Sequence, residues 1–185
     1  MIPLQEIISI VIAYIFGCLN GAYYIGKLYY RQDIRELGST NAGARNAGRV
    51  FSRSAFIFTV VIDAIKVIIP LIIATKLLEM NSILIACMAI ALLLGHLWPV
   101  QLGFRGGKGV VVYLAAALVL APIPLLVCGV TILIGYQIHK NLTLIAMIGF
   151  CTIPVGLLLL DRSIELTATF LIMLSIVVIM HRNGD

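Results

Sequence analysis

Charged residues are scarce in this sequence, and their scarcity constrains the fold. Asp, Glu, Lys and Arg make up 11% of the 185 residues, whereas 62% of the residues are hydrophobic. Such a chain has too little polar surface to cover a water-soluble globule of its size, which excludes a soluble domain. The mean hydropathy is +1.11, and the apolar character extends along the whole length. We therefore expect an all-α integral membrane protein, a polytopic bundle that forms a single transmembrane domain over residues 1–185.

Signal-peptide and metal-site patterns are also missing. The opening stretch MIPLQEIISIVIAYIF has no basic n-region and no A-x-A cleavage site, so we expect a retained helix. The cysteines lie far apart inside apolar runs without a C-x-x-C spacing, and they are Cys18, Cys87, Cys128 and Cys151. We interpret them as packing residues and expect no metal site. The net charge of +5 comes from cations in short loops between apolar segments, which indicates membrane topology and no nucleic-acid partner.

About seven apolar segments are long enough, or nearly so, to cross a bilayer. They cover roughly residues 3–29, 54–78, 82–98, 107–121, 123–138, 142–160 and 164–180. Ser54 and either Asn81 or Ser82 suit helix N-caps. Pro122 and Pro124 interrupt one apolar stretch, which forms either a hairpin of two short helices or one kinked helix.

The placement of the cations favours the hairpin. Basic clusters at 27–53, 105–108, 139–140 and 181–182 fall on one side of the membrane only if the prolines reverse the chain. The opposite side then carries the acidic residues Glu6, Glu79, Asp161 and Glu165. Because Lys and Arg favour the cytoplasmic ends of spans, we expect the N-terminus outside and the C-terminus and polar loops in the cytoplasm.

The first polar loop, residues 38–49, reads GSTNAGARNAGR and repeats the triplet Asn-Ala-Gly. Glycines let a backbone approach a ligand closely, and arginines offer planar forks that match phosphate. A flexible basic loop that touches anionic headgroups is the alternative, but it does not explain the repetition. The candidate phosphate ligands are Gly38, Ser39, Asn41, Gly43, Arg45, Asn46 and Arg49.

The second polar loop, residues 95–109, reads GHLWPVQLGFRGGKG and leads into an apolar helix. Glycines and a lysine before a helix N-terminus are typical of a phosphate cradle. The spacing is not that of a Walker A loop, which disfavours nucleotide hydrolysis. The candidate ligands here are Arg105, Gly106, Gly107, Lys108 and Gly109.

Three further polar side chains lie within or at the end of apolar segments. His96, beside Trp98, is either an interfacial belt residue or a functional residue. Asp63 and Lys66 share one helical face at i, i+3 spacing, and ionisable groups at that depth usually pair or line a cavity. We expect a structural ion pair between them, with a catalytic Asp63 as the alternative.

These residues together resemble one enzyme family. The stretch 33–49 is similar to the motif D-I-R-x-x-G-S-G-N-x-G-A-T-N-x-x-R of the bacterial acyl-phosphate-dependent glycerol-3-phosphate acyltransferases, the PlsY family. Residues 95–110 resemble the second motif of that family, G-H-x-[FW]-P-V followed by F-[KR]-G-G-K-G-V. Asp63 and Lys66 also resemble its intramembrane D-x-x-K.

The resemblance implies a seven-helix enzyme of the bacterial cytoplasmic membrane. It would move a long-chain acyl group from acyl phosphate to the 1-hydroxyl of glycerol 3-phosphate and would need no cofactor. His96, Ser39, Asn41 and Lys108 are the candidate catalytic residues, with the loop residues above as substrate ligands. Thr143 and His181 stand in the family's third and last motifs and join the ligands. Membrane lipids are the remaining expected partners.

The sequence departs from the family pattern at four places. Thr40 stands where the family usually has glycine, and Arg45 stands where it usually has threonine. The third motif, R-Y-x-S-L-[SA]-S, is reduced to residues 140–146, which keep one hydroxyl in Thr143. The last motif, H-R-x-N-I-x-R, is matched only from His181 to Asn183. A paralogue that uses another phosphorylated acceptor is therefore an alternative.

The reactivity of acyl phosphate limits what the enzyme has to do. Acyl phosphate is already activated, so the enzyme mainly needs to align two anions and offset their repulsion. We assign that role to Arg49 and Lys108, and we expect a substrate phosphate to accept the hydroxyl proton while His96 orients the reactants. The competing class is a transporter or binding protein for organic phosphates, although no inverted repeat with a midplane site is evident.

Overall fold

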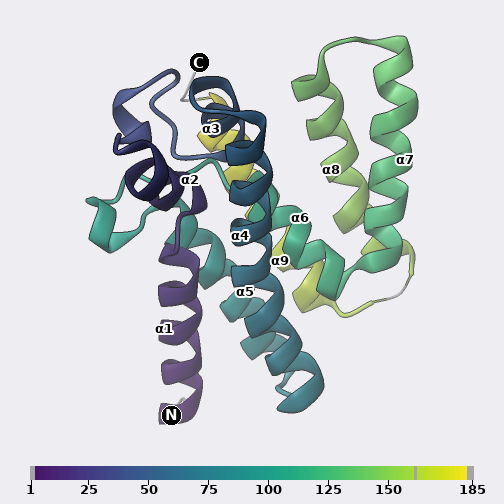
Figure 1. The fold of residues 1–185 in the computed structure, drawn as a ribbon. Helices are drawn as coiled ribbons and strands as arrows, with labels where there is room; N and C mark the ends of the chain where they lie inside the picture. Colours follow the sequence, from purple (N-terminus) through teal and green to yellow (C-terminus); the bar gives the residue numbers. More distant parts are fainter. Residues whose placement is uncertain (1–2, 161, 183–185) are drawn as a thin grey trace.

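The computed structural model describes residues 3–160 and 162–182, and these residues form helices and connecting turns without a strand (Figure 1). Asp161 and Asn183, both named above, lie outside the described residues. The helices are α1 (Leu4–Cys18), α2 (Gly21–Ile25), the π-helical turn η1 (Gly26–Tyr30), the 3₁₀ turn η2 (Ile34–Glu36), α3 (Ala44–Val50), α4 (Arg53–Ile72), the π-helical turn η3 (Ile73–Leu77), α5 (Ser82–Leu97), the 3₁₀ turn η4 (Val100–Leu102), α6 (Val110–Leu120), α7 (Pro122–Ile138), α8 (Leu142–Leu159) and α9 (Ile164–Arg182).

Four of these helical segments are long and apolar enough to cross a membrane. They are Arg53–Leu77, Ser82–Leu102, Leu142–Leu159 and Ile164–Arg182. A fifth span results if α1 is taken together with Gly21–Tyr30, from which it is bent by 43°. The apolar helices α6 and α7 are shorter, with 11 and 17 residues. The expected all-α membrane architecture is therefore present, and each expected segment coincides with a helical one.

Local signals explain most helix boundaries. The segment expected at 3–29 is not one helix, because Asn20 interrupts it: its side chain accepts a hydrogen bond from the Tyr23 backbone N–H at 2.9 Å and starts α2. Ser52, and not Ser54, caps α4 by accepting from the Ala55 N–H at 3.1 Å. Asn81 caps α5 as expected. Two helices, and not one kinked helix, flank the prolines, since α6 ends at Leu120 and α7 begins at Pro122.

The core lies where α5, α6, α8 and α9 meet. Tyr113 of α6 is fully buried, with its ring centroid 5.4 Å from that of Phe150 and 5.5 Å from that of Phe170. The outward helix faces carry large exposed apolar side chains, as a lipid-facing surface requires.

Helices α1 and α5 approach each other especially closely. A Cβ added at Gly17 would collide with the backbone of Leu92, and one added at Gly95 would collide with the backbone carbonyl of Tyr14. Small residues at such positions let two membrane helices pack backbone against backbone. The pair therefore forms a tightly registered unit, while α7 and α8 form a separate antiparallel pair at the other side of the bundle (Figure 1).

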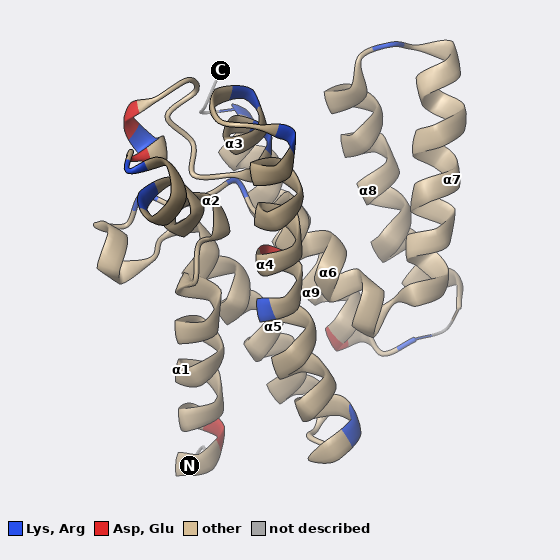
Figure 2. Cartoon of the chain, viewed as in Figure 1, with Lys and Arg blue, Asp and Glu red and all other residues tan. Residues whose placement is uncertain are grey.

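Most cations gather at one end of the bundle, around the first loop, α3 and the α7–α8 connection (Figure 2). This grouping matches the one-sided basic loops expected from the sequence. Apart from the buried Lys66 within α4, two cations depart from the pattern. Lys76 lies in η3 at the far end of the α4 segment, and Arg162 lies between α8 and α9. Both are exposed.

Candidate active site

The two glycine-rich loops meet at the cation-rich end and form a cleft of about 200 Å³. The first loop, the end of α5 with the loop that follows it, and α9 all contribute to its wall. The lining residues are Ser39, Thr40, Asn41, Leu97, Trp98, Phe104, Arg105, Gly106, Gly107, Lys108 and Met180. Of the candidate ligands, Ser39 and Asn41 therefore share one cleft with Arg105, Gly106, Gly107 and Lys108.

A backbone hydrogen bond joins the two loops, because the Ala42 N–H donates to the Gly106 carbonyl at 3.3 Å. Within the second loop, the Gly107 N–H donates to the His96 carbonyl at 3.1 Å. Below them, the Asn20 side-chain amide donates to the Ala42 carbonyl at 2.9 Å. A side chain at either glycine would be too large: a Cβ at Gly106 would collide with the backbone carbonyl of His96, and a Cβ at Gly107 would lie 3.1 Å from the Ala42 carbonyl of the first loop. The close approach of the two loops therefore depends on glycine.

Asn46 shapes the first loop from within. Its side-chain amide donates to the carbonyls of Leu37 at 2.9 Å and Asn41 at 3.1 Å, and its oxygen accepts from the Ser39 N–H at 3.0 Å. Only 2% of the residue is exposed. Gly38 has φ +58° and would collide with this side chain if it carried a Cβ. Asn46 thus holds the loop in shape and does not line the cleft, and its contact with substrate stays a prediction.

Thr40 occupies a strained position in the cleft wall. Its φ is +57°, a left-handed conformation that is costly for a β-branched residue. The glycine usual in the family at this place adopts that conformation without cost. The departure noted in the sequence therefore adds backbone strain at a residue that faces the cleft.

The outer wall of the site is braced by Asp33 and Arg35. The Arg35 guanidinium donates to both carboxylate oxygens of Asp33, at 3.0 and 2.8 Å, and to the Leu102 carbonyl of the second loop. These bonds to Arg35 hold the pKa of the Asp33 carboxyl well below its usual value, with a smaller contribution from Lys27 at 3.6 Å. The same pairing raises the pKa of Arg35. The brace links the first loop to the second and keeps both groups charged.

Beneath the cleft lies a buried ionic cluster of Asp63, Lys66 and His96. Asp63 is 0% exposed, and Lys66 and His96 are each 3% exposed. The Lys66 ammonium donates to Asp63 Oδ1 at 2.9 Å, so the expected ion pair is present. Asp63 Oδ1 also accepts from the Gly21 N–H at 3.2 Å, whereas Oδ2 has no hydrogen-bond partner among the described residues. The lysine therefore pairs with Oδ1, and Oδ2 is left without a donor among the described residues.

Lys66 also fixes the tautomer of His96. Its ammonium has three N–H donors, and three acceptors surround it: Asp63 Oδ1, His96 Nδ1 at 2.8 Å, and the Leu19 carbonyl. Nδ1 of His96 must therefore accept, which places the ring proton on Nε2. Nε2 points to Gly107, because a Cβ added there would collide with it. His96 thus supports the second loop from below and is not part of the cleft lining.

The remaining candidate cations differ in position. Lys108 is half-buried in the cleft wall, and Arg105 is exposed at its rim. Arg49 is exposed in the last turn of α3 and does not line the cleft. Arg45, also exposed, donates to Thr143 Oγ1 at 3.4 Å.

Besides Arg45, Asn46 and Arg49, five candidate ligands lie outside the cleft lining, and the first of them is Gly38. Gly43 caps α3, Gly109 caps α6 with φ +86°, and Thr143 lies near the start of α8. His181 lies at the end of α9, next to the cleft residue Met180, and its ring Nδ1 is hydrogen-bonded to the Val177 carbonyl at 2.9 Å. Their contacts with substrate stay predictions.

Three residues that organise the site were not among the candidates. They are Asn20, Asp33 and Arg35. A fully buried Asn inside an apolar segment is itself a signal for a polar partner, and the Asn-Gly dipeptide at 20–21 marks a break in the helix. Asp33 and Arg35 belong to the first family motif, but nothing in their spacing shows that they pair with each other.

Comparisons with known proteins show the family of the chain. The family profile described as glycerol-3-phosphate acyltransferase matches residues 7–184. A glycerol-3-phosphate acyltransferase 1 from Bacillus cereus is 35% identical over 185 residues, which cover 100% of both chains. A protein of the same name from Desulfitobacterium hafniense is 32% identical over 179 residues, covering 97% of this chain and 88% of the relative.

The fold is also that of solved structures. The crystal structure of PlsY, an integral membrane glycerol 3-phosphate acyltransferase, in its glycerol 3-phosphate form matches with a TM-score of 0.88 and 24% identity, covering 97% of this chain and 89% of that chain. Its lysophosphatidic acid form matches with a TM-score of 0.86 and 23% identity, over the same shares of the two chains. The chain belongs to the glycerol-3-phosphate acyltransferase family.

Proposed function

We propose that this protein transfers a fatty acyl group from acyl phosphate to the 1-hydroxyl of glycerol 3-phosphate. The observation that carries the proposal is the cleft in which Lys108, the glycine backbone of the second loop and the polar first loop face one another. Both substrates bear phosphate, and the site combines cations, backbone amides and hydroxyl or amide side chains. The names of the bacterial relatives support the acceptor.

The proposed reaction is a direct displacement. The 1-hydroxyl oxygen attacks the carbonyl carbon of the acyl phosphate, the bond from that carbon to the phosphate oxygen breaks, and lysophosphatidic acid and inorganic phosphate result. The hydroxyl proton passes to a phosphate oxygen. Lys108 and Arg105 offset the repulsion of the two anions, while Ser39 and Asn41 orient the acceptor. Arg45 and Arg49, outside the cleft lining, attract the anions toward the cleft.

The hydrogen bonds of His96 support an orienting role. With Nδ1 occupied by Lys66, Nε2 carries a proton and is a donor, so it is poorly placed to accept one from the attacking hydroxyl. His96 therefore acts by holding Gly107 and the neighbouring amides in position. A general base from the protein is not needed, because the leaving phosphate supplies the acceptor.

We further propose the membrane arrangement. The chain forms one domain of about seven spans, in which the short helices α6 and α7 cross where the bilayer thins around them. The excess of Lys and Arg at the cleft end supports a cytoplasmic cleft, with the N-terminus outside and the C-terminus inside the cell. The acyl tail of the donor lies in the surrounding lipid.

Phosphate release tests the proposal directly. Purified protein in detergent is given palmitoyl phosphate with or without glycerol 3-phosphate, and palmitoyl-CoA replaces the donor in a parallel reaction. We expect inorganic phosphate and lysophosphatidic acid only when palmitoyl phosphate and glycerol 3-phosphate are both present. Uptake of glycerol 3-phosphate into proteoliposomes without any acyl phosphate, and without product, would instead identify a transporter.

Two variants separate the assigned roles. Lys108→Ala removes a cation from the cleft, and we expect turnover to fall by about 10²-fold or more, the loss typical of a missing transition-state donor. His96→Asn removes the ring but keeps a polar side chain. We expect a smaller loss of turnover that is the same from about pH 5 to pH 9, the range in which histidine titrates. A pH profile that loses its acidic limb in His96→Asn would show a histidine base and contradict the assignment.

A further inference from the structure

The end of the bundle opposite the cleft contains a second cationic pocket. It measures about 240 Å³ and is lined by Lys76 of η3, Arg162, the turn between α6 and α7, and the end of α8. Both cations are exposed, and neither side chain has an ion-pair partner among the described residues. No acidic residue lines the described pocket. Two cations in a pocket whose described lining has no acidic residue favour an anionic ligand.

A backbone group adds to this attraction. Ile123, the second residue of α7, lines the pocket, and an N–H in the first turn of a helix has no acceptor within that helix. The N-terminal end of α7, which carries the positive end of the helix dipole, therefore borders the same space as the two side chains. The three features favour an anionic group of the size of a phosphate.

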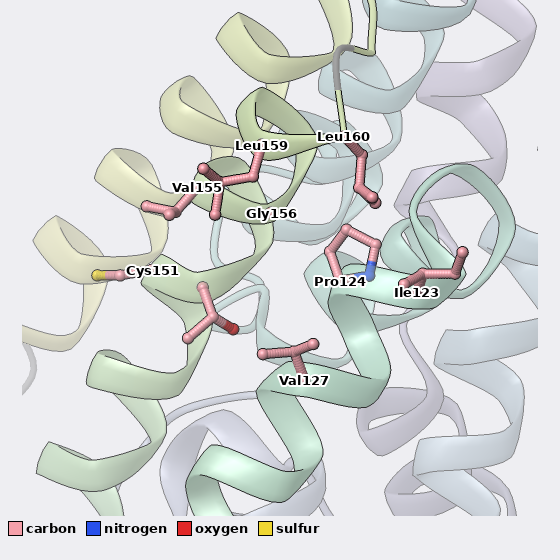
Figure 3. Close-up of a pocket in the computed structure, with 9 residues that line it drawn as sticks. Ile123, Pro124, Val127, Cys151, Val155, Gly156, Leu159 and Leu160 are labelled. Atoms are coloured by element: carbon pink, nitrogen blue, oxygen red, sulfur yellow. The ribbon is translucent and has the colours of Figure 1, made fainter.

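An apolar groove continues from this pocket along α7 and α8. Figure 3 shows its lining, which is almost entirely hydrocarbon. It measures about 400 Å³ and is lined by Ile123, Pro124, Val127, Cys151, Thr152, Val155, Gly156, Leu159 and Leu160. Ile123, Pro124 and Leu160 line both spaces, so the groove and the cationic pocket are continuous.

The groove has the length and direction of a lipid chain. From Leu160 to Cys151 it follows α8 for nine residues, which is about 13 Å at 1.5 Å per residue. One leaflet of hydrocarbon is about 15 Å thick. The groove therefore begins at the interface, where the cations lie, and runs toward the middle of the membrane.

We infer that this composite surface binds one anionic phospholipid of the membrane. The phosphate lies between Lys76 and Arg162, and one acyl chain lies in the groove between α7 and α8. Charge complementarity selects an anionic headgroup over a zwitterionic one, because a choline or ethanolamine cation would face two like charges. The site lies at the opposite end from the cleft and does not depend on the proposed acyl transfer. A lipid held there would bridge the α4 segment and the α7–α8 pair.

Lipid binding to the purified protein tests the inference. The protein in detergent is titrated with dioleoyl phosphatidylglycerol or dioleoyl phosphatidylcholine, and bound lipid is counted by native mass spectrometry. Each cation near an anionic lipid contributes about fivefold to affinity. We therefore expect wild type to prefer the anionic lipid, and the double variant Lys76→Gln/Arg162→Gln to bind it about 30-fold more weakly.

Two further variants make the test specific. Arg53→Gln/Lys140→Gln removes the same charge from exposed positions elsewhere in the chain, and we expect it to bind like wild type. Val155→Phe fills the groove from a residue that is 52% exposed, and we expect it to weaken binding of both lipids. Equal binding of the two lipids by wild type, an unchanged preference in Lys76→Gln/Arg162→Gln, or unchanged binding in Val155→Phe would overturn the inference.

Discussion

Replacing Lys66 by Met removes the only cation that contacts the buried carboxylate of Asp63 among the described residues. Asp63 then keeps a single hydrogen bond, from the Gly21 N–H at 3.2 Å, for a side chain that is 0% exposed. His96 Nδ1 and the Leu19 carbonyl lose their donor at the same time. Breaking a buried pair in this way costs about 3–5 kcal/mol.

A double substitution removes both charges of the pair at once. In Asp63→Asn/Lys66→Met no charge remains, and the new side-chain oxygen still accepts from the Gly21 N–H. We expect this variant to lose only about 1–2 kcal/mol, for the hydrogen bonds that Lys66 made to other groups. The double variant should therefore be more stable than Lys66→Met alone. The substitution of Lys66 alone thus lowers the free energy of unfolding, and the added substitution of Asp63 recovers part of the loss.

Thermal unfolding in detergent, followed by the loss of helical circular dichroism, measures the difference. For a chain of this length the single variant should melt about 10 °C below wild type. Lys140→Met is the matched control, since Lys140 is exposed and its ammonium lies 5.0 Å from the centroid of the Tyr136 ring. Two results would contradict the stabilising role of the ionic cluster. Lys66→Met could melt at the same temperature as Lys140→Met, or the double variant could lose as much stability as Lys66→Met and Asp63→Asn lose together.

Three further predictions follow from the same contacts. Gly107→Ala should lower the free energy of unfolding by about 1–3 kcal/mol and lower phosphate release, because the methyl group meets the His96 ring. In the control Gly129→Ala, the added carbon has no neighbouring atom within 4 Å outside its own helix backbone, so this variant should melt at or slightly above the temperature of wild type. Thr40→Gly should relieve about 1 kcal/mol of backbone strain, and a lower melting temperature than wild type would show that Thr40 makes a contact worth more than its strain. Since Arg35 holds the pKa of Asp33 low, the charged carboxylate stabilises the fold above its unfolded pKa of about 3.9. This stability is lost as the pH falls below that value, so the gap in melting temperature between wild type and Asp33→Asn should be full near neutral pH and shrink in acid. A gap that stays constant into strong acid would exclude the Asp33 carboxylate as its source.

The meeting of the two loops could be predicted from the sequence, because alternate connections of a helical bundle lie at the same end. Once Pro122 and Pro124 are taken to reverse the chain, the basic clusters at 139–140 and 181–182 fall at that end too, as observed (Figure 2). Composition and the placement of cations were enough for that step. The ion pair of Asp63 and Lys66 was likewise predictable, since i, i+3 spacing inside an apolar segment leaves these groups few other partners.

Which cations face the cleft could not be predicted. The segment 44–50 has no apolar periodicity, yet it forms α3 and places Arg45 and Arg49 on its exposed side. Lys108 and Arg105 occupy the cleft wall instead. Asn46 resembled a ligand by residue type, but the turn of chain at 34–41 surrounds it and takes up its hydrogen bonds. Contacts of this kind depend on tertiary structure, and the spacing of residues in the sequence does not predict them.

The glycine contact between α1 and α5 governs how the bundle responds to its membrane. Gly17 and Gly95 each exclude a side chain where the other backbone passes, so neither helix slides along the other by a residue without a clash. A bilayer thicker or thinner than the spans is accommodated by tilting. These two helices must therefore lean as one body, carrying Asn20 and His96 with them, so that bilayer thickness changes the inclination of the site while its internal spacing is preserved.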